Sequence, residues 1–255
     1  ALVAFLTGWI ASEYGLRPYP FLLGTGLMLL GLFFSIFLIK DTRGHARKEE
    51  GSSSTPLLKN IFWDTTWKHR DLGSVTQAGL INNLNDGMAW GLFPILLSSK
   101  GFSLEQIGIV VAVYPAVWGV GQLVTGKMAD HYPKKKLLFY GMLLQGIVLV
   151  TLVWAQTMMH FIGLMLLLGW GTAMVYPTFL ATIAEITHPR DRAGSIGIFR
   201  LWRDLGYAVG AVLTGIIADQ VSIEAAVLLV GMITILSAGI IQFRMKGENS
   251  GITDS

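Results

Sequence analysis

Cysteine is absent from this 255-residue chain, which excludes disulfide bonds, thiolate metal sites and a cysteine nucleophile. Charged residues are also scarce: they make up 14% of the sequence, whereas average soluble domains contain about 25%. Hydrophobic residues account for 53%, and the mean hydropathy is +0.57. This composition excludes an ordinary soluble domain and predicts an all-α integral membrane protein whose main partner is the lipid bilayer.

Long apolar stretches define the expected spans. A bilayer core needs about 20 mostly apolar residues per helix, and eight stretches qualify as candidates, although the first is too short to cross alone. They cover residues 1–12, 20–39, 74–97, 105–126, 137–156, 160–183, 197–218 and 223–243. Pro94, Pro115 and Pro177 fall inside these stretches and predict kinks rather than helix ends.

Lysine and arginine are distributed unevenly between the loops on the two sides. The loops at 40–73, 127–136 and 184–196 and the tail after 243 hold fifteen of the nineteen cations, whereas the opposite loops hold only Arg17 and Lys100. Because basic short loops stay in the cytoplasm, we expect a multi-pass protein of the plasma (inner) membrane with a cytoplasmic carboxy terminus. The basic clusters therefore indicate topology, and no nucleic-acid partner is expected.

The segment 40–73 differs from its surroundings because it mixes both charges with a serine run and a proline. It predicts a cytoplasmic linker, whose later part, IFWDTTWKH, is expected to form a short amphipathic helix on the membrane surface. The domains expected are the last two helices of an amino-terminal bundle over 1–39, this linker, a six-helix bundle over 74–246 and a cytoplasmic tail over 247–255.

The sequence contains a weak internal repeat. A shift of 207 residues aligns AVGAVLTGIIA at 208–218 with ALVAFLTGWIA at 1–11. Each copy is followed by a short loop and a second apolar helix, and parallel repeats of this kind are typical of one large class of transporters. If the second copy closes a six-helix half, the first closes another half, of which four helices are missing.

One loop carries a family signature. GKMADHYPKKK at 126–136 resembles the loop motif of the major facilitator superfamily: Gly126, Asp130, Lys134 and Lys135 match, while His131 and Pro133 depart from the motif. GWIASEYGLRPYPF and PRDRAGSIG resemble two further connections of that superfamily. The resemblance implies a major-facilitator-type helical bundle with eight of an expected twelve transmembrane helices, which would be helices five to twelve. The resemblance also implies that the missing amino-terminal helices of the same protein pack against the helices present here.

Polar residues in the third stretch mark an expected substrate or proton pathway. Asp86 lies near the middle of INNLNDGMAW and of its span, where an ionisable group is costly and usually faces a cavity or a partner. The resemblance places this span and the one at 160–183 along the central cavity. The pathway residues expected are Asn82, Asn85, Asp86, Tyr114, Gln122, Thr172 and Tyr176. The alternative is that these polar groups only join helices.

A second set of residues is expected to form a cytoplasmic gate. It comprises Gly126, Asp130, Lys134, Lys135, Glu185, Arg192, Arg200, Arg203 and Asp204. Within it, Arg200 and Arg203 fall in the first two turns of the span predicted at 197–218, where cations oppose the helix dipole and need carboxylate partners. An anion-binding arginine is the alternative.

Other chemistries find little support in the sequence. GQLVTGK at 121–127 fits part of a nucleotide phosphate loop, but Met128 follows and the segment ends an apolar helix. The five histidines show no ligand spacing, so neither a metal nor a cofactor is expected. We expect a secondary active transporter of a small solute coupled to a proton gradient through Asp86. A nontransporting membrane sensor on the same fold and, less favoured, a membrane-embedded enzyme are the alternatives.

Overall fold

The computed structural model describes residues 17–38 and 55–246, together with Leu6, Ile10, residues 13–15 and Gly51. Every long element in these residues is a helix, and the described part of the chain contains no strand. The chain divides into two compact units, residues 1–51 and 52–255. The span expected over 1–12 and the tail expected over 247–255 lie largely or wholly outside the described residues.

The first unit contains one long helix, α2 (Tyr19–Leu38), close to the span expected over 20–39. Its side chains are apolar all round, and none of its residues is buried within the protein. A helix of 20 residues with this composition is long and apolar enough to cross a membrane.

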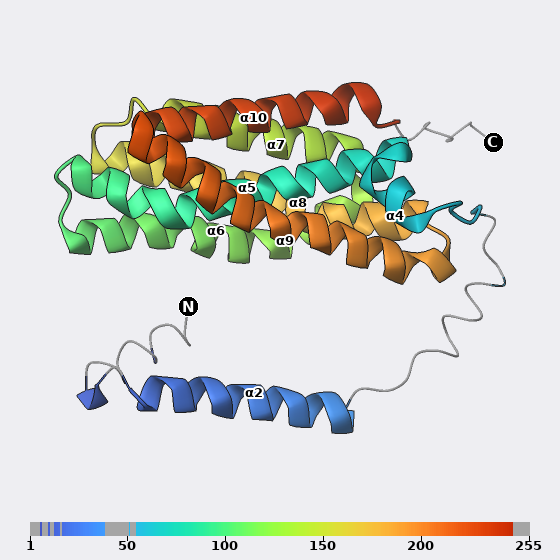
Figure 1. Cartoon of the computed structure of the whole chain (residues 1–255), viewed down its shortest axis with the longest axis horizontal. Helices are drawn as coiled ribbons and strands as arrows, with labels where there is room; N and C mark the ends of the chain where they lie inside the picture. The colour runs from blue at the N-terminus through green and yellow to red at the C-terminus, as the bar shows by residue number, and fades with distance from the viewer. Residues whose placement is uncertain are drawn as a thin grey trace. The chain divides into compact units, whose positions relative to one another are not determined.

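The second unit is a bundle of six long helices whose successive members run in opposite directions (Figure 1). They are α5 (Arg70–Ser99), α6 (Leu104–His131), α7 (Lys134–Leu152), α8 (Met158–Ile186), α9 (Pro189–Gln220) and α10 (Ile223–Arg244). We call the end that carries His131, Lys134 and Arg244 the basic end. Each of the six spans expected between 74 and 243 thus corresponds to a helix.

The described residues confirm only part of the eight membrane-crossing helices expected, since the span over 1–12 lies largely outside them. In the described residues, six helices, α2 and α6 to α10, have the length and apolar composition to cross a membrane. Helix α5 is 30 residues long but less apolar, because Asn82, Asn83, Asn85 and Asp86 interrupt it. Its polar groups are buried inside the bundle, which makes this composition compatible with a place among membrane-spanning helices.

The helix ends correct two of the expected loops. Helix α6 continues to His131 and α7 begins at Lys134. Helix α9 begins at Pro189, whose ring suits the first helical turn, and the His188 side chain accepts a bond from the Arg190 N–H. The loops expected over 127–136 and 184–196 therefore shrink to a few residues, and most of PRDRAGSIG is helical.

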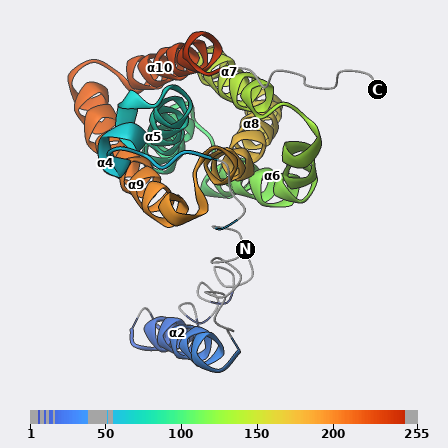
Figure 2. The ribbon, with the colours of Figure 1, turned by 90° about the vertical axis from the view of Figure 1, so that its right-hand side faces the viewer.

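The six helices form an open ring. Each helix packs against the next in the order α9, α5, α10, α7, α8 and α6, and α9 also contacts α10. Seen end-on in Figure 2, α5 and α8 lie toward the inside of the bundle. In the described bundle no substantial contact between α6 and α9 closes this ring. Both helices instead touch α5 and α8, so these four helices meet along one side of the bundle.

Glycine allows α9 to approach α5 closely. Gly206 and Gly210 lie against the backbone of Leu80 and Leu84, at positions where any Cβ atom would overlap the neighbouring chain. Small residues four apart are a common means of close helix contact in membranes. The contact between α5 and α9 is the most extensive one between described helices, and it positions the side chains that α9 directs toward α5.

Apolar side chains gather in two separate clusters, one toward each end of the bundle. Leu96, Val110 and Phe161 belong to the cluster far from the basic end, and Leu138, Phe179 and Ile241 belong to the cluster near it. The buried polar residues of α5 lie between the two. The core therefore contains a polar layer at mid-height.

The linker segment is helical next to the bundle. α4 (Ile61–Trp63) continues into a π-helical turn, η1 (Asp64–Lys68), and the Asn60 side chain caps the start. Thr65 is fully buried and donates to the Ser195 hydroxyl (3.2 Å), while Trp202 donates to Thr66 (3.0 Å). The expected amphipathic helix is thus short and fastened to α9.

Candidate functional site

The central feature of the bundle is the buried carboxyl group of Asp86. It lies 16 residues from the start of α5 and 13 from its end, about 24 Å and about 20 Å along the helix axis. The Tyr114 hydroxyl of α6 donates to one carboxylate oxygen, and the Tyr207 hydroxyl of α9 lies 3.4 Å from the other. Asp86 therefore connects α6 and α9, the two helices at which the ring is open.

A row of aromatic side chains extends this site toward the basic end. The Tyr114 hydroxyl also lies 3.2 Å from the Thr172 hydroxyl of α8, and the Tyr114 ring stacks on Trp118. Trp118 in turn meets the Tyr176 ring edge-on at 5.4 Å. These side chains form an amphipathic surface, which suits an organic solute with both apolar and polar groups.

Arg203 completes the row, and its position corrects an expectation. Its Nη1 donates to the Tyr176 hydroxyl (3.2 Å), and its Nε and Nη2 donate to Asp204 (2.9 and 2.7 Å). Because α9 begins at Pro189, Arg203 is fourteen residues into the helix rather than in its first two turns. Arg203 and Asp204 thus belong to the region around Asp86 instead of a helix end.

The two asparagines near Asp86 have different surroundings. Asn85 donates to Gln145 of α7 (3.2 Å) and accepts from Thr234 of α10 (2.8 Å), so it joins three helices on the side away from Tyr114. Asn82 lies one turn before Asp86, donates weakly to Asn83 (3.4 Å) and has a buried Oδ1 without a hydrogen-bond partner in the described structure. The geometry of Asn85 favours helix joining, whereas Asn82 offers an open acceptor beside the carboxylate.

The remaining pathway candidate, Gln122, is half-buried on α6, two turns beyond Tyr114. Thr125, close to it, is buried and donates to the Ala173 carbonyl of α8 (2.6 Å). Tyr207 was missed by the sequence reasoning, although it follows Arg203 and Asp204 at spacings of four and three. That helical spacing was the available signal.

At the basic end the structure brings together part of the expected gate. Lys134 at the start of α7 forms an ion pair with Glu185 in the last turn of α8 (2.5 Å). Both residues and Lys135 line a cavity of about 180 Å³ together with Asp71 and Lys246. Elsewhere, Asp130 and Arg200 are exposed, and Gly126 and Arg192 are half-buried on α6 and α9. At the basic end, Lys134, Lys135 and Glu185 thus lie together, while Arg203 and Asp204 pair with each other nearer to Asp86.

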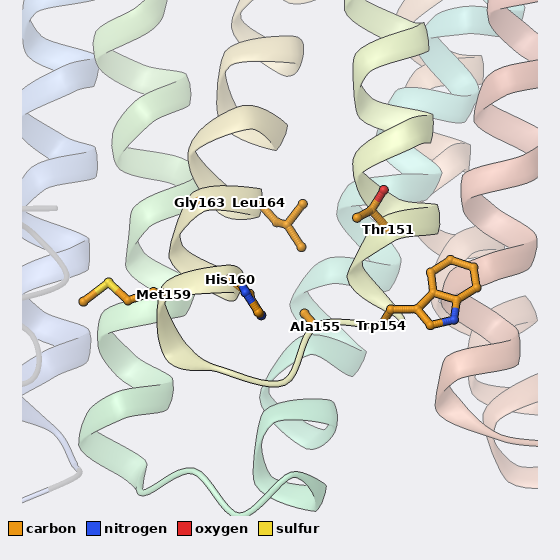
Figure 3. A pocket seen from close by; sticks show the side chains of 7 residues that line it. All are labelled: Thr151, Trp154, Ala155, Met159, His160, Gly163 and Leu164. Carbon is orange, nitrogen blue, oxygen red and sulfur yellow. The ribbon is translucent and has the colours of Figure 1, made fainter.

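A separate cavity of about 430 Å³ lies at the opposite end, where α7 ends and α8 begins (Figure 3). It is lined by Thr151, Trp154, Ala155, Met159, His160, Gly163 and Leu164. His160 is the one titratable side chain among these lining residues, and no carboxylate accompanies it there. Within the described residues, no group of three acidic or histidine side chains converges on a metal-sized position.

Comparison with known proteins gives the same family as the loop motif. The family model described as Major Facilitator Superfamily matches residues 75–253. An uncharacterized MFS-type transporter of Methanocaldococcus jannaschii is 26% identical over 193 residues, which is 74% of this chain and 46% of that protein.

Two further relatives carry more specific names. A probable hexose phosphate transport protein of Chlamydia trachomatis is 22% identical over 60% of this chain and 34% of its own length. The multidrug resistance protein MdtG of Enterobacter lignolyticus is 22% identical over 91% of this chain and 55% of its own length. The chain thus spans about half the length, or less, of these curated relatives.

The match to the family model covers most of the chain, and it includes the loop motif, α6 to α10 and all but the first five residues of α5. These helices have the antiparallel order and buried polar layer described above, and five of them are apolar enough to cross a membrane. The chain therefore belongs to the major facilitator superfamily.

Proposed function

We propose that this protein is a secondary active transporter, in the plasma (inner) membrane, that moves a small solute and is driven by a proton gradient through Asp86. The observation that carries this proposal is the hydrogen bonding of one buried carboxyl group to hydroxyls of α6 and α9. Names of relatives, which include hexose phosphate transport and multidrug resistance, support transport of a solute but differ in its chemistry.

Hydroxyl partners suit a carboxyl group that gains and loses a proton. A tyrosine hydroxyl can donate to the ionised form and accept from the protonated form, so either state keeps a partner. Within the described residues no lysine or arginine hydrogen-bonds to Asp86, and Arg203 is engaged by Asp204 and Tyr176. A charge at this depth is not locked by an ion pair, and its neutralisation can accompany movement of α6 relative to α9.

The open side of the bundle supports a second part of the proposal. Large apolar side chains are exposed on the two helices at the ends of the ring: Leu123 and Val120 on α6, and Val212 and Leu201 on α9. We infer that the amino-terminal helices of the same protein cover this side and that the solute passes between the two halves. Lys134, Glu185 and their neighbours then act as a gate at the basic end.

Transport by the complete protein in vesicles tests the role of Asp86. Asp86→Asn should abolish accumulation driven by an inward or outward proton gradient, while exchange of solute without a gradient continues, because the amide keeps the shape and cannot carry the proton. The matched control is Asp219→Asn, an exposed carboxylate in the last turn of α9. A labelled hexose phosphate and a lipophilic cationic dye are the first solutes to test, with a trapped pH dye reporting proton movement.

Accumulation by Asp86→Asn as strong as that of the parent would refute coupling at this residue. Saturable solute binding without any flux in the parent protein would instead identify the nontransporting sensor.

A further inference from the structure

A groove of about 880 Å³ lies beside α10 at the basic end, outside the site described above. Its walls are the apolar residues Ile235, Leu236, Gly239, Ile240 and Phe243 of α10 together with Trp67, Arg70 and Arg244. It therefore combines a long apolar surface with two guanidinium groups at one end.

The two arginines are held in place by backbone contacts. Arg70 donates through Nε to the Arg244 carbonyl (3.1 Å), and Arg244 donates through Nη2 to the Trp67 carbonyl. The Arg244 guanidinium also lies 3.9 Å from the centre of the Trp67 ring. The positive charges are thus fixed side by side rather than spread on freely moving side chains.

Neither arginine forms an ion pair with a carboxylate in the described structure. Asp71, which follows Arg70, accepts instead from the backbone N–H of Lys246 (2.7 Å). The Arg244 Nε is buried and has no hydrogen-bond partner. Two adjacent guanidinium groups without a carboxylate form a local positive site, and guanidinium binds phosphate well because its donors match the phosphate oxygens.

The apolar part of the groove belongs to the surface that meets lipid. Phe243 is 85% exposed and Leu236 is 67% exposed on a helix long and apolar enough to span the membrane. Trp67 is half-exposed near the helix end, where tryptophan commonly sits at the level of lipid headgroups. Chain atoms of a lipid can therefore reach the groove directly from the bilayer.

We propose that this groove binds one anionic phospholipid from the leaflet at the basic end. The lipid phosphate pairs with Arg70 and Arg244, and one acyl chain lies along Ile235, Gly239 and Phe243. Basic pockets beside membrane helices attract anionic headgroups in this manner. This binding goes beyond the transport proposal and does not depend on it, because its measurement requires no solute.

Native mass spectrometry of the purified protein with added phosphatidylglycerol or phosphatidylcholine tests the charged part. Arg70→Gln combined with Arg244→Gln should weaken phosphatidylglycerol binding roughly tenfold or more. Phosphatidylcholine binding should weaken much less, because its choline cation already offsets the charge of the phosphate that both lipids carry. The control, Lys127→Gln combined with Lys136→Gln, removes the same charge from exposed positions at the same end and should retain binding. Arg70→Gln alone, at an exposed side chain, gives a milder version should the double variant unfold.

The apolar part is tested by Gly239→Phe, which fills the groove and leaves both arginines in place. A Cβ atom at Gly239 has open space around it, and so does one at Gly108 of α6, the matched control. Gly239→Phe should weaken phosphatidylglycerol binding by a similar factor, and Gly108→Phe should not. The proposal would be overturned if the parent protein bound both lipids equally well, or if the lysine control lost as much phosphatidylglycerol binding as the arginine variant. It would also be overturned if Gly239→Phe bound phosphatidylglycerol as well as the parent does and inorganic phosphate competed with the lipid.

Discussion

The two tyrosines that bond to Asp86 are not equivalent partners. Tyr114 is 4% exposed and contacts both Asp86 and Thr172, whereas Tyr207 is 38% exposed and lies 3.4 Å from the carboxylate. A hydrogen bond to a charged group is worth about 1.5–3 kcal/mol, and an unsatisfied buried group loses its solvation as well. Tyr114 therefore has the larger share in holding the carboxyl group.

For these two residues we predict that Tyr114→Phe lowers the free energy of unfolding by about 1–3 kcal/mol and that Tyr207→Phe lowers it by under about 1 kcal/mol. Unfolding in detergent, followed by tryptophan fluorescence, measures both. In an Asp86→Asn background the loss caused by Tyr114→Phe should shrink, since the charged partner is gone. A loss of the same size in both backgrounds would show that the hydroxyl acts on another group.

Among the elements, α9 packs especially closely against its neighbour α5. Its glycines Gly206 and Gly210 meet the α5 backbone so closely that a methyl group cannot be added without separating the helices. This contact also positions Tyr207, which lies between them and bonds to Asp86. Helix packing and site geometry are therefore set by the same surface.

We predict that Gly210→Ala destabilises the bundle by about 1–3 kcal/mol, the usual effect of overpacking, and weakens gradient-driven transport. The matched control is Gly215→Ala on the same helix, where an added Cβ has open space. It should be neutral or slightly stabilising, because alanine favours a helix over glycine by about 1 kcal/mol. Thermal unfolding of the two variants decides the matter, and equal melting temperatures would contradict the close-packing explanation.

Features defined by neighbouring residues in the sequence could be predicted, whereas contacts between residues far apart in the sequence could not. Hydropathy located α5 to α10 because each helix needs a long apolar stretch of its own. It misjudged the start of α9, since Pro189 and the cap by His188 are local signals within a charged segment. The Asp86–Tyr207 contact joins residues 121 apart in sequence, and no pattern within a single helix reveals which helices become neighbours.

For the molecule as a whole, the sequence motif was sufficient for the family, which the family model confirms. These 255 residues contain no cysteine, so a single cysteine introduced here is the one labelling site within them. Ser99 and Lys136 are exposed at opposite ends of the bundle. Both positions can receive a single cysteine with little effect on packing.

We predict that Ser99→Cys and Lys136→Cys react with a membrane-impermeant maleimide from opposite sides, with Lys136→Cys accessible from the cytoplasm. The reason is the concentration of lysine and arginine in the loops at the basic end. Labelling of intact cells and of inverted vesicles provides the comparison. Reaction of both variants from the same side would contradict the membrane-crossing order of α5 to α7.

The polarity of α5 also has a consequence for biosynthesis. An aspartate at the centre of a helix disfavours insertion by about 2.5–3.5 kcal/mol, and three asparagines accompany Asp86 in the same helix. Its closest neighbour, α9, begins at Pro189, about 90 residues after α5 ends at Ser99. At about 5–20 residues per second, the ribosome needs roughly 5–20 seconds to produce that stretch. During this interval α5 lacks the neighbour with which it has its most extensive contact, so part of its polar side is without the helix that covers it in the finished bundle.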